Sequence, residues 1–351
     1  MRTLLISDLH LGSLLARDVL RRPEALAALE AQVARADRLV LLGDTLELLD
    51  GRPDEALNVA ESVLPRLAGA LGPSGQLVIV PGNHDHALVR PWVRQRIESG
   101  RPIAPASRVP RSSSALLGAL CALASPARVE VRYPGLWVAP GIYATHGHYV
   151  DRHLIAALSA LLPGPHPRDD TPRRLSTLDY ERSLGADSGS LQELLATTLP
   201  EPLAGAAAAA LAGTRRALIS AVPLLGSPGL RGASAVWASL LDHGHARRGA
   251  LPAMAEVASQ LRLRADAIIF GHIHRRGPLS GDAPGLWRPG GGRGPRLLNT
   301  GCWVWDPALA GSGTGARPYR PGGAVLIEDG RAPRALDLLA GVPDAVLAAR
   351  G

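Results

Sequence analysis

Short apolar runs that end in polar clusters alternate with helical patterns over the first 85 residues. The apolar runs at 3–7, 38–42 and 77–80 predict strands, and the patterns at about 23–36 and 54–71 predict helices. Alternating strands and helices imply right-handed βαβ units that share one sheet. The polar residues after each strand are therefore predicted to meet at the carboxyl edge of the sheet, where ligands bind in such folds.

Later segments extend the α/β pattern. Residues 128–133 and 136–145 are predicted as two strands with a turn at Pro134-Gly135 between them. Further strands are predicted at 265–270, 296–300 and 324–328. We interpret residues 151–261, which are rich in Arg, Pro, Ala and Gly, as a helical cap inserted into one catalytic domain formed by 1–150 and 262–351.

Charge and composition narrow the class of partner. The 351 residues carry a formal net charge of +7, but they include no Lys, so all 38 basic residues are Arg. This composition is typical of a GC-rich genome, so the high basicity is weaker evidence for a nucleic-acid partner than the net charge alone indicates. An anionic substrate is favoured, and nucleic acid stays possible as a partner. The two cysteines are too few for a disulfide framework and fit a reducing compartment.

Neither the N-terminal segment nor the most apolar region of the sequence indicates a targeting or membrane-spanning segment. The apolar stretch after Met1 is too short for a signal peptide, and the apolar region at 202–241 is interrupted by Arg and Pro before it reaches the roughly 18 residues of a membrane span. We therefore expect a cytoplasmic protein without a transmembrane segment. Peripheral membrane contact is left open.

The residues at the predicted strand ends are carboxylates, one amide and imidazoles. They are Asp8, His10, Asp44, Asn83, His84, His146, His272 and His274. Mixed nitrogen and oxygen donors without a thiolate suit Mn, Fe or Zn. These donors are too many for one catalytic ion with an open position, but they suit two ions that share a bridging carboxylate. The pattern predicts a binuclear metal centre.

Five blocks in order carry a resemblance to a known family. They are Asp8-Leu-His10, Gly43-Asp44, Gly82-Asn-His-Asp85, His146-Gly-His148 and Gly271-His-Ile-His274. Together they resemble the signature of the calcineurin-like metallophosphoesterase superfamily. The resemblance implies a four-layer αββα sandwich of two mixed sheets flanked by helices. Within the superfamily, the blocks and the helical insertion are similar to the UDP-2,3-diacylglucosamine hydrolase branch, which cleaves a lipid-linked pyrophosphate.

The resemblance also implies a role for each ligand. One ion would be held by Asp8, His10 and His274, and a second by Asn83, His146 and His272. Asp44 would bridge them. Two such divalent ions, with Mn favoured over Fe or Zn, would activate a bridging hydroxide that hydrolyses a phosphate ester or pyrophosphate bond. The expected substrate is anionic and phosphorylated, either nucleotide-linked or lipid-like.

His84 is implied to be a proton donor to the leaving oxygen rather than a ligand. Such a histidine needs a carboxylate to orient it, and Glu47 stands where many relatives have Asp; Asp50 is the alternative partner. Members of the diacylglucosamine hydrolase branch carry Arg where this chain has His84. The branch therefore does not account for this residue.

Several residues are ambiguous from sequence. His148, Arg275 and Arg276 are candidate substrate contacts, although a loop or surface role is an equal or simpler interpretation. His86 and His153 are interpreted as structural or exposed. Two functions compete with the leading one: a phosphodiesterase or nuclease of the same superfamily, and a non-catalytic scaffold on this fold, which is disfavoured because scaffolds lose ligands and none is lost here.

Overall fold

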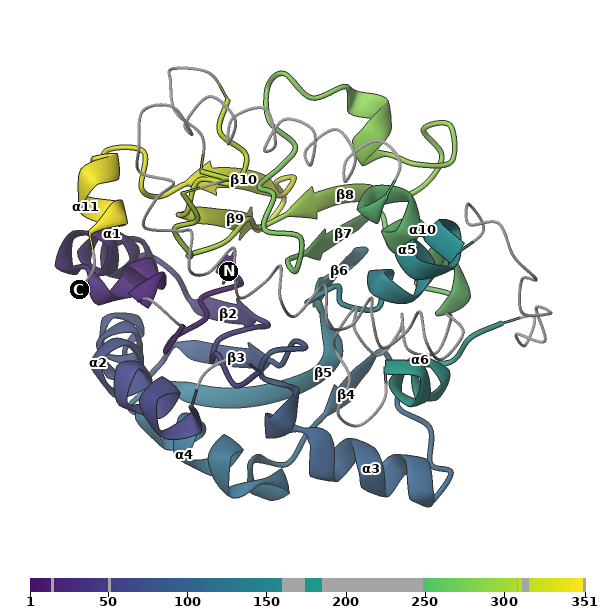
Figure 1. Cartoon of the computed structure of the whole chain (residues 1–351), viewed down its shortest axis with the longest axis horizontal. Coiled ribbons are helices and arrows are strands. Elements are labelled where there is room, and N and C mark those ends of the chain that lie inside the picture. The colour runs from purple at the N-terminus through teal and green to yellow at the C-terminus, as the bar shows by residue number, and fades with distance from the viewer. Residues whose placement is uncertain are drawn as a thin grey trace, which may run out of the picture.

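Among the residues that the structure describes, ten strands form one large mixed sheet with helices packed against it (Figure 1). The structure is a computed structural model that describes residues 1–13, 16–49, 52–159, 174–184, 249–307, 309–310 and 316–349. The strands are β1 (Arg2–Ile6), β2 (Arg38–Leu42), β3 (Gln76–Val80), β4 (Ala106–Arg108), β5 (Arg128–Ala139), β6 (Ile142–Thr145), β7 (Ala267–Phe270), β8 (Arg296–Asn299), β9 (Gly323–Glu328) and β10 (Arg334–Asp337). The helices are α1 (Pro23–Val33), α2 (Pro53–Leu71), α3 (Arg90–Glu98), α4 (Ala115–Leu123), α5 (Val150–Ser159), α6 (Thr177–Leu184), α10 (Ala250–Gln260) and α11 (Asp344–Ala348). The predicted mixed α/β class is confirmed.

The three strands predicted near the N-terminus form a parallel group within the sheet. The strand order is β10-β9-β1-β2-β3-β5-β6-β7-β8, and β4 pairs with β5. Leu39 of β2 is in register with Leu4 of β1 and with Leu77 of β3, all in parallel pairs. Helices α1 and α2 each begin with a proline in the first turn, where its missing N–H removes no hydrogen bond. The carboxyl ends of β1, β2 and β3 therefore lie side by side.

The predicted turn at Pro134-Gly135 is wrong. Strand β5 continues through these residues because it changes partner there: Arg128–Val131 pair in parallel with β3, and Gly135–Ala139 pair with β6 in the antiparallel direction. The turn lies at the second Pro-Gly pair, Pro140-Gly141, where Gly141 has a φ of 72°. Both dipeptides carry the same turn signal, and only the partner strands distinguish them.

Three apolar clusters explain why most strands read as continuous apolar runs. Leu4 and Ile6 of β1 point into a cluster with the buried faces of α1, α2 and α4, whereas Leu5 between them points to the opposite face. On that opposite face, residues of β1, β2, β3 and β9 meet residues of β5, β6, β7 and β8. A third cluster packs α5 and α10 against β6, β7 and β8, on the right in Figure 1. Both faces of the strands are buried.

The predicted cap segment is described only in part, as α5, α6 and α10. Residues 160–173 and 185–248 lie outside the described residues, so the cap stays a prediction. Helix α6 is attached to the rest of the chain by buried side chains: Glu181 accepts hydrogen bonds from the hydroxyls of Tyr133 (2.7 Å) and Tyr149, and the Tyr180 ring stacks on Tyr149. None of the helices described has both the length and the apolar character needed to cross a membrane.

Candidate metal centre

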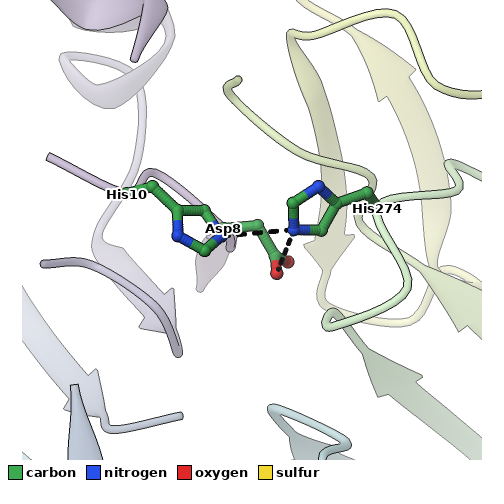
Figure 2. Close-up of side chains that lie close together, drawn as sticks. All are labelled: Asp8, His10 and His274. Atoms are coloured by element: carbon green, nitrogen blue, oxygen red, sulfur yellow. Dashed lines mark hydrogen bonds and ion pairs between the residues drawn. The ribbon is translucent and has the colours of Figure 1, made fainter. Parts of the chain in front are cut away.

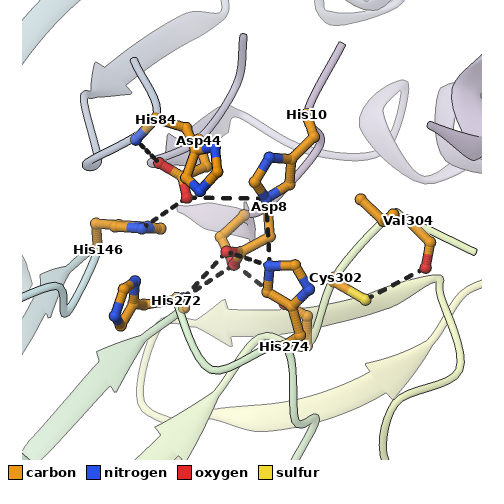
Figure 3. Close-up of polar contacts among 12 residues, drawn as sticks. Asp8, His10, Asp44, His84, His146, His272, His274, Cys302 and Val304 are labelled. Carbon is orange, nitrogen blue, oxygen red and sulfur yellow. Dashed lines mark hydrogen bonds and ion pairs between the residues drawn. The ribbon is translucent and has the colours of Figure 1, made fainter. Parts of the chain in front are cut away.

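The predicted ligand residues all follow strands and meet at one edge of the sheet. Asp8 and His10 follow β1, Asp44 follows β2, and Asn83 and His84 follow β3. His146 follows β6, and His272 and His274 follow β7. Figure 3 labels all of these residues except Asn83 and shows their side chains turned toward one another from strands far apart in the sequence. The convergence predicted from the strand ends is present in the structure.

Five of the ligand residues have an unusual backbone conformation. Their φ angles are 56° at Asp8, 45° at His10, 51° at Asp44, 68° at His272 and 58° at His274. Within the described part of the chain only Ala16 and Arg262 are other non-glycine residues with positive φ. The left-handed region costs an L-residue about 1–3 kcal/mol and is concentrated at functional sites. The fold therefore holds these side chains inward at an energetic cost.

Asp8, His10 and His274 form the first candidate ligand group (Figure 2). His274 Nε2 lies 3.2 Å from Asp8 Oδ1 and 3.2 Å from His10 Nε2. The Asp8 carboxylate also accepts a hydrogen bond from Ser7 Oγ and one from the His272 backbone N–H at 3.1 Å. The Asp8 carboxylate is thereby held between β1 and the turn after β7.

Asp44, Asn83, His146 and His272 form the second group. His146 Nε2 lies 3.1 Å from Asp44 Oδ2 and 3.1 Å from Asn83 Oδ1, and His272 Nδ1 lies 3.1 Å from the same amide oxygen. Asp44 Oδ2 is also 3.8 Å from His10 Nε2 of the first group. Asp44 thus lies between the two groups, as Figure 3 shows.

These residues fit two divalent cations. Every donor is an imidazole nitrogen or a carboxylate or amide oxygen, which Mn, Fe and Zn accept. Donors bound at about 2.1 Å lie roughly 3.0–3.4 Å apart along the edge of an octahedral or tetrahedral site. The separations of 3.1–3.2 Å within each group match that spacing.

Glycines before the ligands allow the strand ends to approach this closely. A Cβ atom on Gly82 would lie 2.3 Å from Asp44 Oδ1 and 2.6 Å from the His146 ring. A Cβ atom on Gly43, where φ is 90°, would lie 2.1 Å from the same ring. The glycines of the Gly-Asp and Gly-Asn-His-Asp blocks are therefore required because the neighbouring ligands occupy the space of a side chain.

Asp85 joins the loops after β2 and β3. Its fully buried carboxylate accepts hydrogen bonds from the backbone N–H groups of Gly82 (2.6 Å), Thr45 (2.8 Å) and Leu46 (3.4 Å). Burial, together with the nearby charge of Asp44, raises the pKa of Asp85 to about 6. Asp85 therefore holds the turn that carries Asn83 and His84 beside Asp44.

Glu47 pairs with two histidines at once. Its carboxylate lies 2.8 Å from His84 Nδ1 and 2.9 Å from His10 Nδ1. Burial raises the pKa of Glu47, but the hydrogen bonds from His10 and His84 outweigh burial and lower the pKa to about 2. Asp50, the alternative partner for His84, lies outside the described residues.

Local charges favour a protonated His84. Burial lowers the pKa of His84, but the charges of Asp44 and Glu47 outweigh burial and raise the pKa above its ordinary value. The His84 backbone N–H also donates to Asp44 Oδ1 at 2.9 Å. These charges therefore favour the protonated form of His84, which Glu47 holds at the rim of the ligand groups.

The two candidate arginines form ion pairs, whereas the His148 ring lies beside that of His146, with ring centroids 5.7 Å apart. Arg275 pairs with Asp282 at 2.6 Å and lies over the Trp287 ring, and Arg276 pairs with Asp337. A substrate role for either arginine would require these pairs to open, and that role stays a prediction. His148 is buried, with its Nε2 3.3 Å from the Tyr133 hydroxyl.

Several supporting residues were not found from sequence. His86 is not a ligand; its Nε2 lies 3.1 Å from Glu181 Oε2 of α6. Asp151 at the start of α5 lies 2.8 Å from His272 Nε2. Asp151 and Glu181 stand in helical sequence without a motif, so no sequence signal indicated their roles.

Comparison with known proteins connects this geometry to a family. The model of the calcineurin-like phosphoesterase family matches residues 1–181, just over half of the chain. No curated protein matches the chain. Among solved structures, the crystal structure of a cold-active protein-tyrosine phosphatase of the psychrophile Shewanella sp. aligns with 95% of this chain and 80% of its own, with 12% sequence identity and a TM-score of 0.33.

Gly82→Ala is predicted to weaken metal binding without unfolding the protein. The added methyl group must displace Asp44 or His146, so we expect the affinity for Mn²⁺ to fall by at least about tenfold. Titration calorimetry on metal-stripped protein measures this change. Gly69→Ala is the matched control, since a Cβ atom there meets no atom within 4 Å; equal affinities in the two variants would contradict the steric argument.

Metal binding is predicted to release protons at neutral pH. Burial lowers the pKa of His146, but the charge of Asp44 outweighs burial and raises this pKa to about 9 in the metal-free protein. Because an ion needs the neutral imidazole, its apparent affinity should rise about tenfold per pH unit up to about pH 9. The same proton stabilises the metal-free fold; this stability is complete below the unfolded pKa of 6.5 and is lost as the pH rises through about 9.

Calorimetry in two buffers of different ionisation enthalpy counts the released protons. Heats that do not depend on the buffer at pH 7 would show that His146 is neutral before the ions bind.

Proposed function

Because the chain belongs to the calcineurin-like phosphoesterase family, we propose that it hydrolyses a phosphate ester or pyrophosphate bond at a centre of two divalent ions. Membership of the family makes it a metal-dependent phosphoester hydrolase. One observation carries the proposal of two ions: Asp44 lies within reach of both ligand groups, 3.1 Å from His146 Nε2 and 3.8 Å from His10 Nε2. A carboxylate in that place is the expected bridge.

In this proposal Asp8, His10 and His274 would hold one ion, Asn83, His146 and His272 would hold the other, and Asp44 would serve both. Bound ions would supply Lewis acidity, which lowers the pKa of water and offsets negative charge on the phosphoryl oxygens. Mn²⁺ is the proposed metal, with Fe and Zn as alternatives, because all donors are nitrogen or oxygen. The fixed side chains keep these donors oriented before substrate binds.

His84 is the proposed general acid. Its raised pKa favours the protonated ring, and Glu47 on Nδ1 leaves Nε2 to donate toward the leaving oxygen. The side chains of His84 and His274 are 22% and 31% exposed, whereas those of His146 and Asp8 are fully buried. Substrate is therefore expected to approach the centre over His84 and His274.

We extend the proposal to the fold and the substrate. The apolar cluster shared by β1–β3 and β6–β8, with helices on the outer faces, supports the expected four-layer αββα sandwich. The substrate is proposed to be an anionic phosphorylated compound, since the proposed centre would hold cations and the surroundings of His84 favour its protonated form. Nucleotide-sugar pyrophosphates, the substrate type of the UDP-2,3-diacylglucosamine hydrolase branch, are one candidate among several classes.

A substrate panel tests the proposed activity. Metal-stripped protein reloaded with Mn²⁺ should turn over at least one of three classes: monoesters, diesters or nucleotide-sugar pyrophosphates. Asp44→Asn should lower kcat at least about 100-fold because it removes the shared carboxylate. Asp54→Asn, an exposed carboxylate on α2, is the control and should leave kcat unchanged. An inactive wild-type protein, or an Asp44→Asn variant as active as wild type, would refute the proposal.

His84→Ala tests the proton donor. Substrates with poor leaving groups should slow roughly 10²–10⁴-fold because their leaving oxygen needs the proton, and substrates with good leaving groups should slow far less. The measurement is kcat/KM across a series of aryl phosphates of increasing leaving-group pKa. His86→Ala, two residues along the same loop, should change all members of the series equally. A His84→Ala loss that is independent of leaving-group pKa would exclude the acid role.

A further inference from the structure

The His272 imidazole presents its two nitrogens to different partners. Nδ1 lies 3.1 Å from the Asn83 amide oxygen, on the side where the ligand atoms converge. Nε2 lies 2.8 Å from Asp151 Oδ1, on the opposite side of the ring. A hydrogen bond from Nε2 to the carboxylate would keep the proton on Nε2 and leave the Nδ1 lone pair directed toward an ion.

Two other ligand imidazoles follow the same rule with different acceptors. His10 directs Nε2 to the ligand atoms and donates from Nδ1 to Glu47 at 2.9 Å. His146 directs Nε2 to Asp44 and donates from Nδ1 to the Leu42 carbonyl oxygen at 3.0 Å. The acceptor behind each ring fixes its tautomer and raises its basicity, and such groups commonly contribute a factor of 10–100 to metal affinity. Asp151 occupies this place behind His272.

We propose that Asp151 is a positioning residue of the second ion site, which it controls through the His272 ring. The inference rests on the proposed two-ion centre. It assigns a role to the start of α5, because Asp151 is an acid in the first turn of that helix and its side chain is 33% exposed. The beginning of the segment 151–261 is therefore part of the metal-binding structure.

A purely local role for Asp151 predicts something different. Acidic residues in the first turn stabilise a helix through its dipole, and Asp151 would then matter only for the stability of α5. Asp179 provides the comparison: it lies in the first turn of α6, its side chain is 29% exposed, and it accepts hydrogen bonds from Ser176. If helix stability were the whole role, the two aspartates would respond alike to substitution by Asn.

Metal titration separates the two ion sites without reference to activity. Metal-stripped wild type, Asp151→Asn, Asp151→Glu and Asp179→Asn are titrated with Mn²⁺ by calorimetry. Wild type and Asp179→Asn should bind two ions. Asp151→Asn should keep one ion at unchanged affinity and bind the second 10–100-fold more weakly. Asp151→Glu, which retains a carboxylate acceptor, should recover most of the lost affinity.

Three results would overturn the inference: both affinities unchanged in Asp151→Asn, both lowered by the same factor, or the same effect from Asp179→Asn. Circular dichroism and the melting temperature of each stripped variant report whether α5 is lost; a lowered melting temperature together with an equal loss at both sites indicates the structural role. A wild type that binds two ions and hydrolyses nothing would refute the proposed function but leave the role of Asp151 intact.

Discussion

The close approach of the carboxyl ends of five strands is the constraint on which the site depends. Residues of β1, β2, β3, β6 and β7 must finish at one edge, and the residues after them must turn inward instead of continuing the strand direction. Five ligands accept a left-handed backbone to do so, and Gly43 and Gly82 leave the space that the neighbouring ligands fill. The apolar clusters on both faces of the strands stabilise the fold against this local cost.

The close approach of the strand ends also buries the carboxylates of Asp8 and Asp44, which need positive charge nearby to stay ionised. Asp8 and Asp44 are buried at the edge, where burial raises the pKa of each, yet neighbouring protonated histidines outweigh burial and hold both values below their ordinary range. Protons on His146 and His274 supply that charge in the metal-free protein, because the pKa of each is raised by its carboxylate partner against the effect of burial. Metal ions held by these side chains would therefore compete with protons for them.

The sequence predicted those site residues that directly follow strands. An apolar run followed by Asp, Asn or His predicts a side chain at the carboxyl edge, and the predicted ligands after β1, β2, β3, β6 and β7 lie there. It did not separate Pro134-Gly135 from Pro140-Gly141, because the choice depends on strand partners, and it did not detect β4 or β10. Nor did it find Asp151, since helical sequence does not show which side chain reaches a ligand.

The loop from Gly82 to His86 shows why such contacts need three dimensions. Its four consecutive side chains have four destinations: Asn83 joins the ligands, His84 meets Glu47, Asp85 binds backbone N–H groups, and His86 meets Glu181. A loop held at each residue has little freedom to rotate, so the His84 ring is oriented before substrate arrives. Because Glu181 belongs to α6, the end of this loop at His86 is attached to a helix about 100 positions later in the chain. The Glu47 side chain, longer than the Asp of many relatives, contacts both His10 and His84. The position of His84, the proposed proton donor, is therefore coupled to that of His10, a predicted ligand.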